Sequence, residues 1–200
     1  MTALRKRTRL SPDARKDQLL DTATQMIVAA GLQSFSMESL ARTAGVSSPL
    51  VYNYFASRPV LLKTLLEREF EAYAQELTGQ VNAAQSFEEV VRIFVGSNFD
   101  HHAPGNILPI LESQPEIAVA IRDRQEGYRK QVGAYLVASA AETYKLSRTQ
   151  AELVVSMSSG ASVAAAGYAA RNNADREKTI DLAMTYIQAG LNRIAQRNEP

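Results

Sequence analysis

The sequence predicts an all-α protein. Apolar residues recur at i, i+3 and i+4 through almost the whole chain, and no segment alternates in the manner of a strand. Ser or Asp residues precede the apolar runs in the position of helix N-caps, and glycines follow several of them. The predicted helices comprise residues 12–30, 37–44, a short one beginning at Ser47, a long one beginning at Ser57 with Gly79 near its end, 86–101, 105–113, 115–145, 148–171 and 175–196.

Composition excludes several functional classes. The 200 residues are 46% hydrophobic and 22% charged, which is typical of a globular protein with a buried core. Cysteine is absent, so disulfides and thiolate metal sites are excluded. His101 and His102 are the only histidines, and no paired acid and base or activated nucleophile is recognisable. We therefore expect no enzyme, no catalytic residue and no cofactor.

Two segments bear on metal binding and localisation. Asp100, His101 and His102 are adjacent, and neighbouring residues rarely point at one ion, so no metal site is expected. The basic N-terminus lacks the apolar core of a secretory signal. Residues 153–170 carry no charge but include four serines and two glycines, which favours a packed helix over a membrane span. The sequence predicts a cytoplasmic protein with no membrane partner.

The charge is distributed unevenly along the chain. Residues 1–70 contain ten Lys or Arg and six Asp or Glu, whereas residues 71–200 contain 12 and 15. This asymmetry indicates an anionic partner for the first third of the chain.

Two short predicted helices meet at a tight turn. Ser36 precedes one that ends before Gly45, and only Val46 separates Gly45 from the next cap, Ser47. This pattern predicts a helix-turn-helix, whose second helix enters the major groove of DNA. On a helical wheel Val46, Leu50 and Asn53 are expected to face inward. The predicted outward set is Ser47, Ser48, Val51 and Tyr52.

The segment "FSMESLARTAGVSSPLVYNYFASRPVLL" resembles the DNA-binding signature of TetR-family transcriptional regulators. The resemblance covers about residues 12–66. Arg58 and Pro59 depart from the family's frequent Lys and acidic residue, but Arg58 keeps the positive charge and Pro59 fits a first helical turn. The resemblance implies a homodimer that binds a double-stranded DNA operator and is regulated by a small-molecule effector. It also implies that DNA is contacted by Ser36, Ser47, Ser48, Pro49, Val51, Tyr52, Tyr54 and Arg58.

The expected organisation has three parts. Residues 1–10 form a basic arm, residues 11–56 a three-helix helix-turn-helix DNA-binding domain, and residues 57–200 a helical ligand-binding and dimerisation domain. The predicted outward face of the recognition helix has no Arg, Lys, Gln or Asn to read a base edge. We therefore expect DNA shape to contribute to specificity, together with an arm in the minor groove formed by Arg5, Lys6, Arg7 and Arg9.

The C-terminal two thirds contain a candidate cavity. Ile121, Gln125, Tyr128, Val132, Tyr135 and Ser139 form a stripe at helical spacing. Such a stripe serves either as core or as the wall of an apolar pocket with a few polar groups. The candidate ligand-binding residues are Phe94, Phe99, Gln125 and Tyr128.

The last two predicted helices are candidates for the dimer interface. Residues 158–167 are rich in small side chains, which allow close helix approach. The predicted apolar face of the last helix consists of Ile180, Ala183, Met184, Ile187, Leu191 and Ile194. These faces form either an inter-subunit four-helix bundle or the core of one subunit.

Together these features predict a ligand-responsive repressor that binds a palindromic operator as a homodimer and is released by a small apolar effector. The alternative is a helical adaptor or antirepressor that uses the helix-turn-helix for protein contacts.

Overall fold

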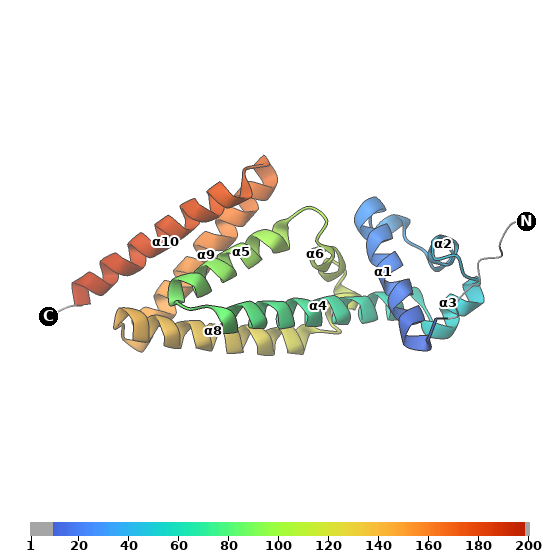
Figure 1. Cartoon of the computed structure of the whole chain (residues 1–200), viewed down its shortest axis with the longest axis horizontal. Helices are drawn as coiled ribbons and strands as arrows, with labels where there is room; N and C mark the ends of the chain where they lie inside the picture. Colours follow the sequence, from blue (N-terminus) through green and yellow to red (C-terminus); the bar gives the residue numbers. More distant parts are fainter. Residues whose placement is uncertain (1–9, 199–200) are drawn as a thin grey trace, which may run out of the picture.

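The computed structural model describes residues 10–198, which contain ten α-helices, one short 3-10 helix and no strand (Figure 1). Their bounds are α1 (Pro12–Ala30), η1 (Leu32–Ser34), α2 (Met37–Thr43), α3 (Ser48–Tyr54), α4 (Arg58–Ala83), α5 (Phe87–His102), α6 (Ile107–Glu112), α7 (Pro115–Ala118), α8 (Arg122–Tyr144), α9 (Arg148–Asn172) and α10 (Arg176–Asn198). The all-α prediction is confirmed. The arm residues Arg5, Lys6, Arg7 and Arg9 lie outside the described residues.

Side-chain caps account for most helix starts. A serine hydroxyl accepts a hydrogen bond from a backbone amide in the first turn of α1, α2, α4, α5 and α9, through Ser11, Ser36, Ser57, Ser86 and Ser147. Each cap satisfies an amide that has no partner within the helix, which contributes about 1 kcal/mol. Gly31 ends α1 with φ 80, a left-handed conformation that glycine adopts without strain.

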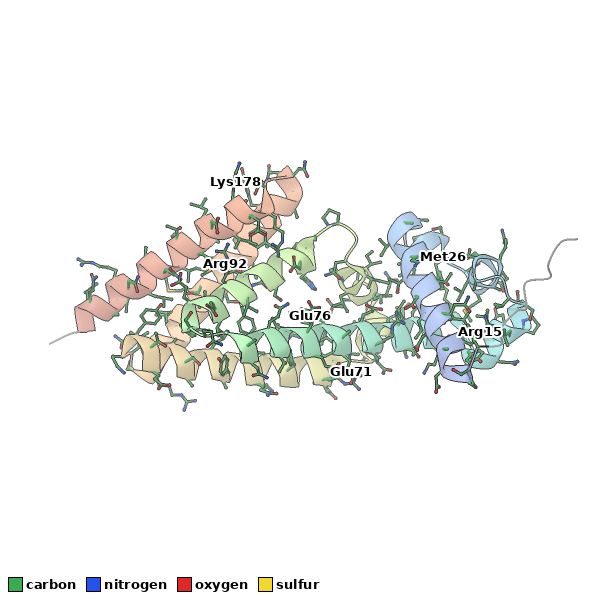
Figure 2. The ribbon with its side chains drawn as sticks, in the orientation of Figure 1. Arg15, Met26, Glu71, Glu76, Arg92 and Lys178 are labelled. Atoms are coloured by element: carbon green, nitrogen blue, oxygen red, sulfur yellow. The ribbon has the colours of Figure 1, made fainter. Side chains whose placement is uncertain are left out.

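The long helix α4 connects the two ends of the molecule (Figure 1). Helices α1–α3 form a small head at one end, and α5 and α8–α10 form a bundle at the other. Glu71 and Glu76 are exposed on α4 between these ends (Figure 2). Helix α4 continues past Gly79 to Ala83.

The buried side chains form two hydrophobic cores. The first joins α1–α3 to the N-terminal half of α4 and to α6 and α7, and its fully buried residues include Leu40, Leu65 and Leu111. The second lies among α5, α8, α9 and α10. The first core therefore draws on helices from both sides of the expected domain boundary at residues 56 and 57.

The prediction of one continuous helix over residues 115–145 is wrong. Helix α7 ends at Ala118, and α8 begins only at Arg122 because Ile121 leaves the helical conformation, with φ −118 and ψ 4. Ile117 and Ile121 are both buried in the first core. The break thus lets α7 pack against α4 while α8 turns toward the second core.

The apolar face predicted for dimerisation on the last helix lies inside the subunit. Ile180, Ala183, Met184, Ile187 and Leu191 are buried in the second core, and Ile194 packs against it. The sequence pattern had identified a buried face correctly, but not its partner, because one apolar stripe satisfies an intramolecular and an intermolecular contact equally well.

Helix α9 has the length and composition to cross a membrane. It packs against α5, α8 and α10, and contributes Ala151, Val154 and Ala166 to the second core. These contacts place one face of the helix in the subunit core, whereas Leu153, Met157 and Tyr168 on α9 are exposed.

Leu111→Ala tests whether α6 belongs to the core of the head. The side chain of Leu111 is fully buried, so its truncation should lower the free energy of unfolding by about 2–5 kcal/mol in urea denaturation. Val119→Ala is the control, because Val119 is 51% exposed and should change the stability by less than about 0.5 kcal/mol. Equal stability of the two variants would contradict the assignment.

Candidate DNA interface and effector cavity

The turn between α2 and α3 depends on Gly45. This residue has φ 67, a left-handed conformation that costs most side chains free energy. The amide of Val46 then donates to the carbonyl of Ala41 at 2.9 Å, which closes the end of α2. Helix α3 begins two residues later, so the two short helices are held at a fixed angle, as the sequence predicted.

The orientation of α3 differs from the prediction. Val51 is fully buried in the first core together with Phe55, one turn later. Val51 therefore cannot contact a thymine methyl, and its assignment to the DNA groove is wrong. Val51 and Phe55, at positions i and i+4, set the inward face of α3. This spacing is already present in the sequence.

In the observed orientation of α3 the side-chain amide of Asn53 is exposed, whereas the sequence predicted that Asn53 faces inward. Ser47, Pro49, Tyr52 and Asn53 are exposed and Ser48 is half-buried. Asn53 makes no side-chain hydrogen bond to another described residue, and an asparagine amide can bind adenine through two hydrogen bonds. The premise that this face has no residue able to read a base edge is therefore wrong.

Tyr52 has a partner within the head. Its hydroxyl donates to Oε1 of Glu38 at 3.0 Å. The backbone amide of Glu38 and then the Tyr52 hydroxyl lower the pKa of this carboxyl, while the hydrogen bond raises the pKa of Tyr52. A phosphate contact by Tyr52 would require this hydrogen bond to be exchanged.

The remaining residues expected at DNA occupy varied environments. The hydroxyl of Ser36 caps α2 by accepting from the amide of Ser39 at 3.1 Å. Ser47 is the N-cap residue of α3, but its hydroxyl makes no capping hydrogen bond. Tyr54 is partly buried and packs against the first core. DNA contacts by Ser36, Ser47, Ser48, Pro49 and Tyr54 stay predictions.

Arg58 is part of the structure of the head. Its Nε donates to the carbonyl of Phe35 at 3.2 Å and its Nη2 to the carbonyl of Leu32 at 2.9 Å, and the guanidinium lies 6.0 Å from the centre of the Phe35 ring. These bonds tie the start of α4 to the turn before α2. Arg42 in the last turn of α2 is a further exposed cation of the head, and the sequence prediction did not include it.

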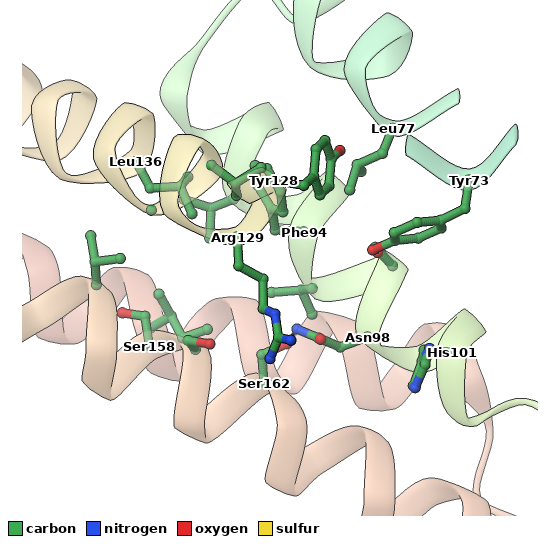
Figure 3. A pocket seen from close by; sticks show the side chains of 18 of the residues that line it. Tyr73, Leu77, Phe94, Asn98, His101, Tyr128, Arg129, Leu136, Ser158 and Ser162 are labelled. Atoms are coloured by element: carbon green, nitrogen blue, oxygen red, sulfur yellow. The ribbon is translucent and has the colours of Figure 1, made fainter. Parts of the chain in front are cut away.

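A cavity of about 590 Å³ lies between α4, α5, α6, α8 and α9 (Figure 3). This volume is within the range of about 300–1,000 Å³ of small-molecule sites. Phe94, Gln125 and Tyr128 line it, as expected. Phe99 does not, because its ring is buried in the second core, and Tyr135 is exposed on the other side of α8.

Part of the cavity wall is polar. Tyr73 and Ser97 share a hydrogen bond of 2.8 Å, and burial raises the pKa of Tyr73. Gln125 donates to Glu112 at 2.5 Å, and His101 lies 3.8 Å from the same carboxylate. Burial lowers the pKa of His101, partly opposed by Glu112 and reinforced by His102. Within residues 10–198 no group of three or more His, Asp or Glu is placed to hold a metal ion.

Helix α6 borders both the cavity and the head. Leu108 and Glu112 line the cavity, while Ile107, Leu108 and Leu111 are buried in the first core with residues of α1 and α4. A ligand in the cavity would therefore touch the helix that packs against the head.

The comparisons with known proteins agree with this architecture. Residues 19–65 match the family model described as "Bacterial regulatory proteins, tetR family". The HTH-type transcriptional activator FasR of Mycolicibacterium smegmatis is 28% identical over 125 residues, which cover 59% of this chain and 57% of FasR. The chain thus matches little more than half the length of this curated relative.

Solved structures show the same fold over a longer region. The fatty acid degradation regulator FadR from Bacillus halodurans has a TM-score of 0.66 at 21% identity and covers 90% of this chain and 96% of its own. FadR from Bacillus subtilis, solved in complex with stearoyl-CoA, has a TM-score of 0.62 at 15% identity and covers 86% of this chain and 96% of its own.

A helix-turn-helix head on a helical body is the architecture that this chain shares with TetR-like transcriptional regulators, and the matched relatives are regulators rather than enzymes. Residues 19–65 therefore carry the DNA-binding domain of the TetR family of bacterial regulatory proteins, and the chain shares the fold of TetR-like regulators over most of its length.

Arg58→Ala should destabilise the head rather than only weaken DNA binding. Two carbonyls lose a charged donor, so the free energy of unfolding should fall by about 1.5–3 kcal/mol in urea denaturation. The exposed Arg42→Ala should change it by less than about 0.5 kcal/mol. If both variants are equally stable, the structural role of Arg58 is wrong.

Proposed function

We propose that this protein is a cytoplasmic repressor that binds a palindromic operator as a homodimer and is released when a small, largely apolar effector fills the cavity. The observation that carries this proposal is the shared helix α6, which lines the cavity and is buried in the core of the head. An effector that displaces α6 would change the orientation of the head on the body. The proposed DNA-binding domain is residues 11–56, and the proposed effector and dimerisation domain is residues 57–200.

The proposed DNA surface combines α3 with the end of α2. Ser47, Ser48 and Pro49 lie at the start of α3, where the helix dipole favours an approach to phosphate. Asn53 supplies an exposed amide for direct readout, and Arg42 supplies a positive charge for the DNA backbone. Base preference thus comes from α3, and sequence-independent affinity from the flanking cation.

The proposed dimer interface is the outer face of α9 and α10. This face presents large apolar side chains that the subunit leaves exposed, with Tyr186 and Leu182 at 70% and 69%. Its members are Leu153, Met157, Val163, Tyr168, Leu182 and Tyr186. An apolar patch of this kind on a soluble chain indicates a protein contact, and a two-fold axis would match a palindromic operator.

Selection of bound fragments from random DNA by the purified protein tests the function. We expect an enriched near-palindrome. Asn53→Ala should relax the preference at one position of each half-site, at a cost of about 1–3 kcal/mol. Arg42→Ala should weaken binding to all DNA sequences by a similar factor. It should also reduce the slope of log affinity against log salt concentration by about one.

Failure to enrich any sequence with folded protein would contradict the proposal and favour the adaptor or antirepressor function. The direction of regulation is tested separately, because FasR is described as an activator. A reporter placed behind the selected operator should be silenced by the protein if it is a repressor.

Light scattering at micromolar concentration tests the dimer. We expect twice the 21.9 kDa mass of one chain. The double variant Leu182→Glu/Tyr186→Glu should give the monomeric mass, because it places four carboxylates in the two-fold interface. Tyr135→Glu is the control, since Tyr135 is also exposed but lies on α8, and it should stay dimeric. A monomeric wild type would contradict the interface.

A further inference from the structure

Arg129 brings a positive charge to the wall of the cavity. It lies on α8, and its side chain extends toward Asn98 and Ser162 (Figure 3). The Nε of Arg129 is 3.4 Å from the carbonyl of Gln125, a long hydrogen bond within the same helix. Arg129 forms no ion pair with any residue between 10 and 198.

Several other cations among the described residues have carboxylate partners. Arg68 pairs with Asp21, Arg92 with Asp181, and Arg176 with Asp100, at 2.6–2.8 Å. Lys130, next to Arg129 in the sequence, pairs with Glu126 at 2.8 Å on the outer side of α8. Arg129 is distinguished from them by lining a cavity without an ion-pair partner among the described residues.

The carboxylate that lines the cavity does not neutralise Arg129. Glu112 accepts a hydrogen bond from Gln125 at 2.5 Å and lies 3.8 Å from His101. These contacts hold Glu112 on the side of α6, outside ion-pair distance of Arg129. With Nε directed to the carbonyl of Gln125, the four N–H groups of the two terminal nitrogens stay available to a molecule in the cavity.

Neutral hydrogen-bonding groups surround the end of Arg129. The amide nitrogen of Asn98 donates to the hydroxyl of Ser162 at 3.0 Å. The hydroxyl of Ser162, which is 3% exposed, uses an acceptor lone pair in this bond and retains its own hydrogen for donation. Ser158 and Ser159, on the preceding turn of α9, also line the cavity. A guanidinium beside serine hydroxyls is a set of donors suited to an oxyanion.

Much of the rest of the wall is apolar. Phe87, Val91 and Phe94 of α5 and Val132 and Leu136 of α8 line the cavity. A ligand that occupies the whole space must therefore be largely apolar, with a polar group where it meets Arg129.

We propose that the effector carries an anionic group, a carboxylate or a phosphate, bound by Arg129 with Ser162 and its neighbouring serines, and an apolar body held between α5 and α8. This inference rests on the proposed function and specifies the chemical class of the effector. The planar guanidinium binds either oxyanion through two parallel hydrogen bonds, which an alcohol or an amine cannot accept in the same way.

The test is isothermal titration calorimetry of the full chain with four probes that share a ten-carbon tail, each below its micelle concentration. The probes are decanoate, decyl phosphate, 1-decanol and decylamine. We expect at least one of the two anions to bind about tenfold or more tightly than decanol, and decylamine to bind most weakly. The stronger of the two anions identifies the carboxylate or the phosphate as the preferred group.

Two variants on α8 assign the preference to Arg129. Arg129→Gln should abolish the advantage of the anions while it leaves the affinity for decanol within about twofold, and Arg129→Lys should retain part of the advantage. Arg124→Gln is the matched control, because it removes the same charge from the same helix at a residue outside the cavity wall. It should behave as the wild type.

Each other outcome overturns the inference. Equal binding of decanol and the anions, an anion preference that persists in Arg129→Gln, or no heat with any probe would each show that Arg129 does not recognise an anionic effector. Operator binding measured on the same preparations separates this failure from that of the proposed function. If the protein selects an operator but shows no anion preference, the proposed function stands and the inference about the effector fails. If it prefers anions but binds no operator, the proposed function fails.

Discussion

The burial of α6 in the core of the head is the constraint on which the rest of the structure depends. Leu111 is fully buried among residues of α1 and α4, and Leu108 on the same helix also borders the cavity. Because packed cores deform little without loss of contacts, a displacement of α6 is transmitted to the head rather than absorbed locally. The breaks before α6 and after α7 allow these short helices to reach the head while α8 returns along α4.

The head illustrates how a fixed turn and one buried pair determine a binding surface. The left-handed Gly45 sets the angle between α2 and α3, and Val51 with Phe55 sets the rotation of α3 about its axis. With these two features fixed, Tyr52 and Asn53 are exposed together. Arg58 stabilises the same arrangement by binding the carbonyls of Leu32 and Phe35, so it has a structural role in the head, while its contact with DNA stays a prediction.

The body separates two uses of apolar surface. The inner faces of α9 and α10 are buried against α5 and α8, whereas the outer faces retain exposed residues such as Met157 and Tyr186. An apolar composition on both faces is expected of a helix that contributes to a subunit core and to an interface. The proposed interface would therefore account for the apolar residues of α9 that the subunit core does not bury.

The sequence by itself determined most of the helix boundaries, the tight turn at Gly45 and the class of protein. These features depend on local chemistry, such as serine caps, proline in a first turn and glycine with positive φ, which adjacent residues express. Phe94, Gln125 and Tyr128 were also predictable as cavity residues, because aromatic and amide groups on an otherwise apolar stripe are typical of pockets. Only the tertiary structure decided which face of α3 is exposed, which face of α10 is internal and which cation lies at the cavity. An apolar stripe shows that a face is buried but not against what, since the partner comes from residues distant in the chain.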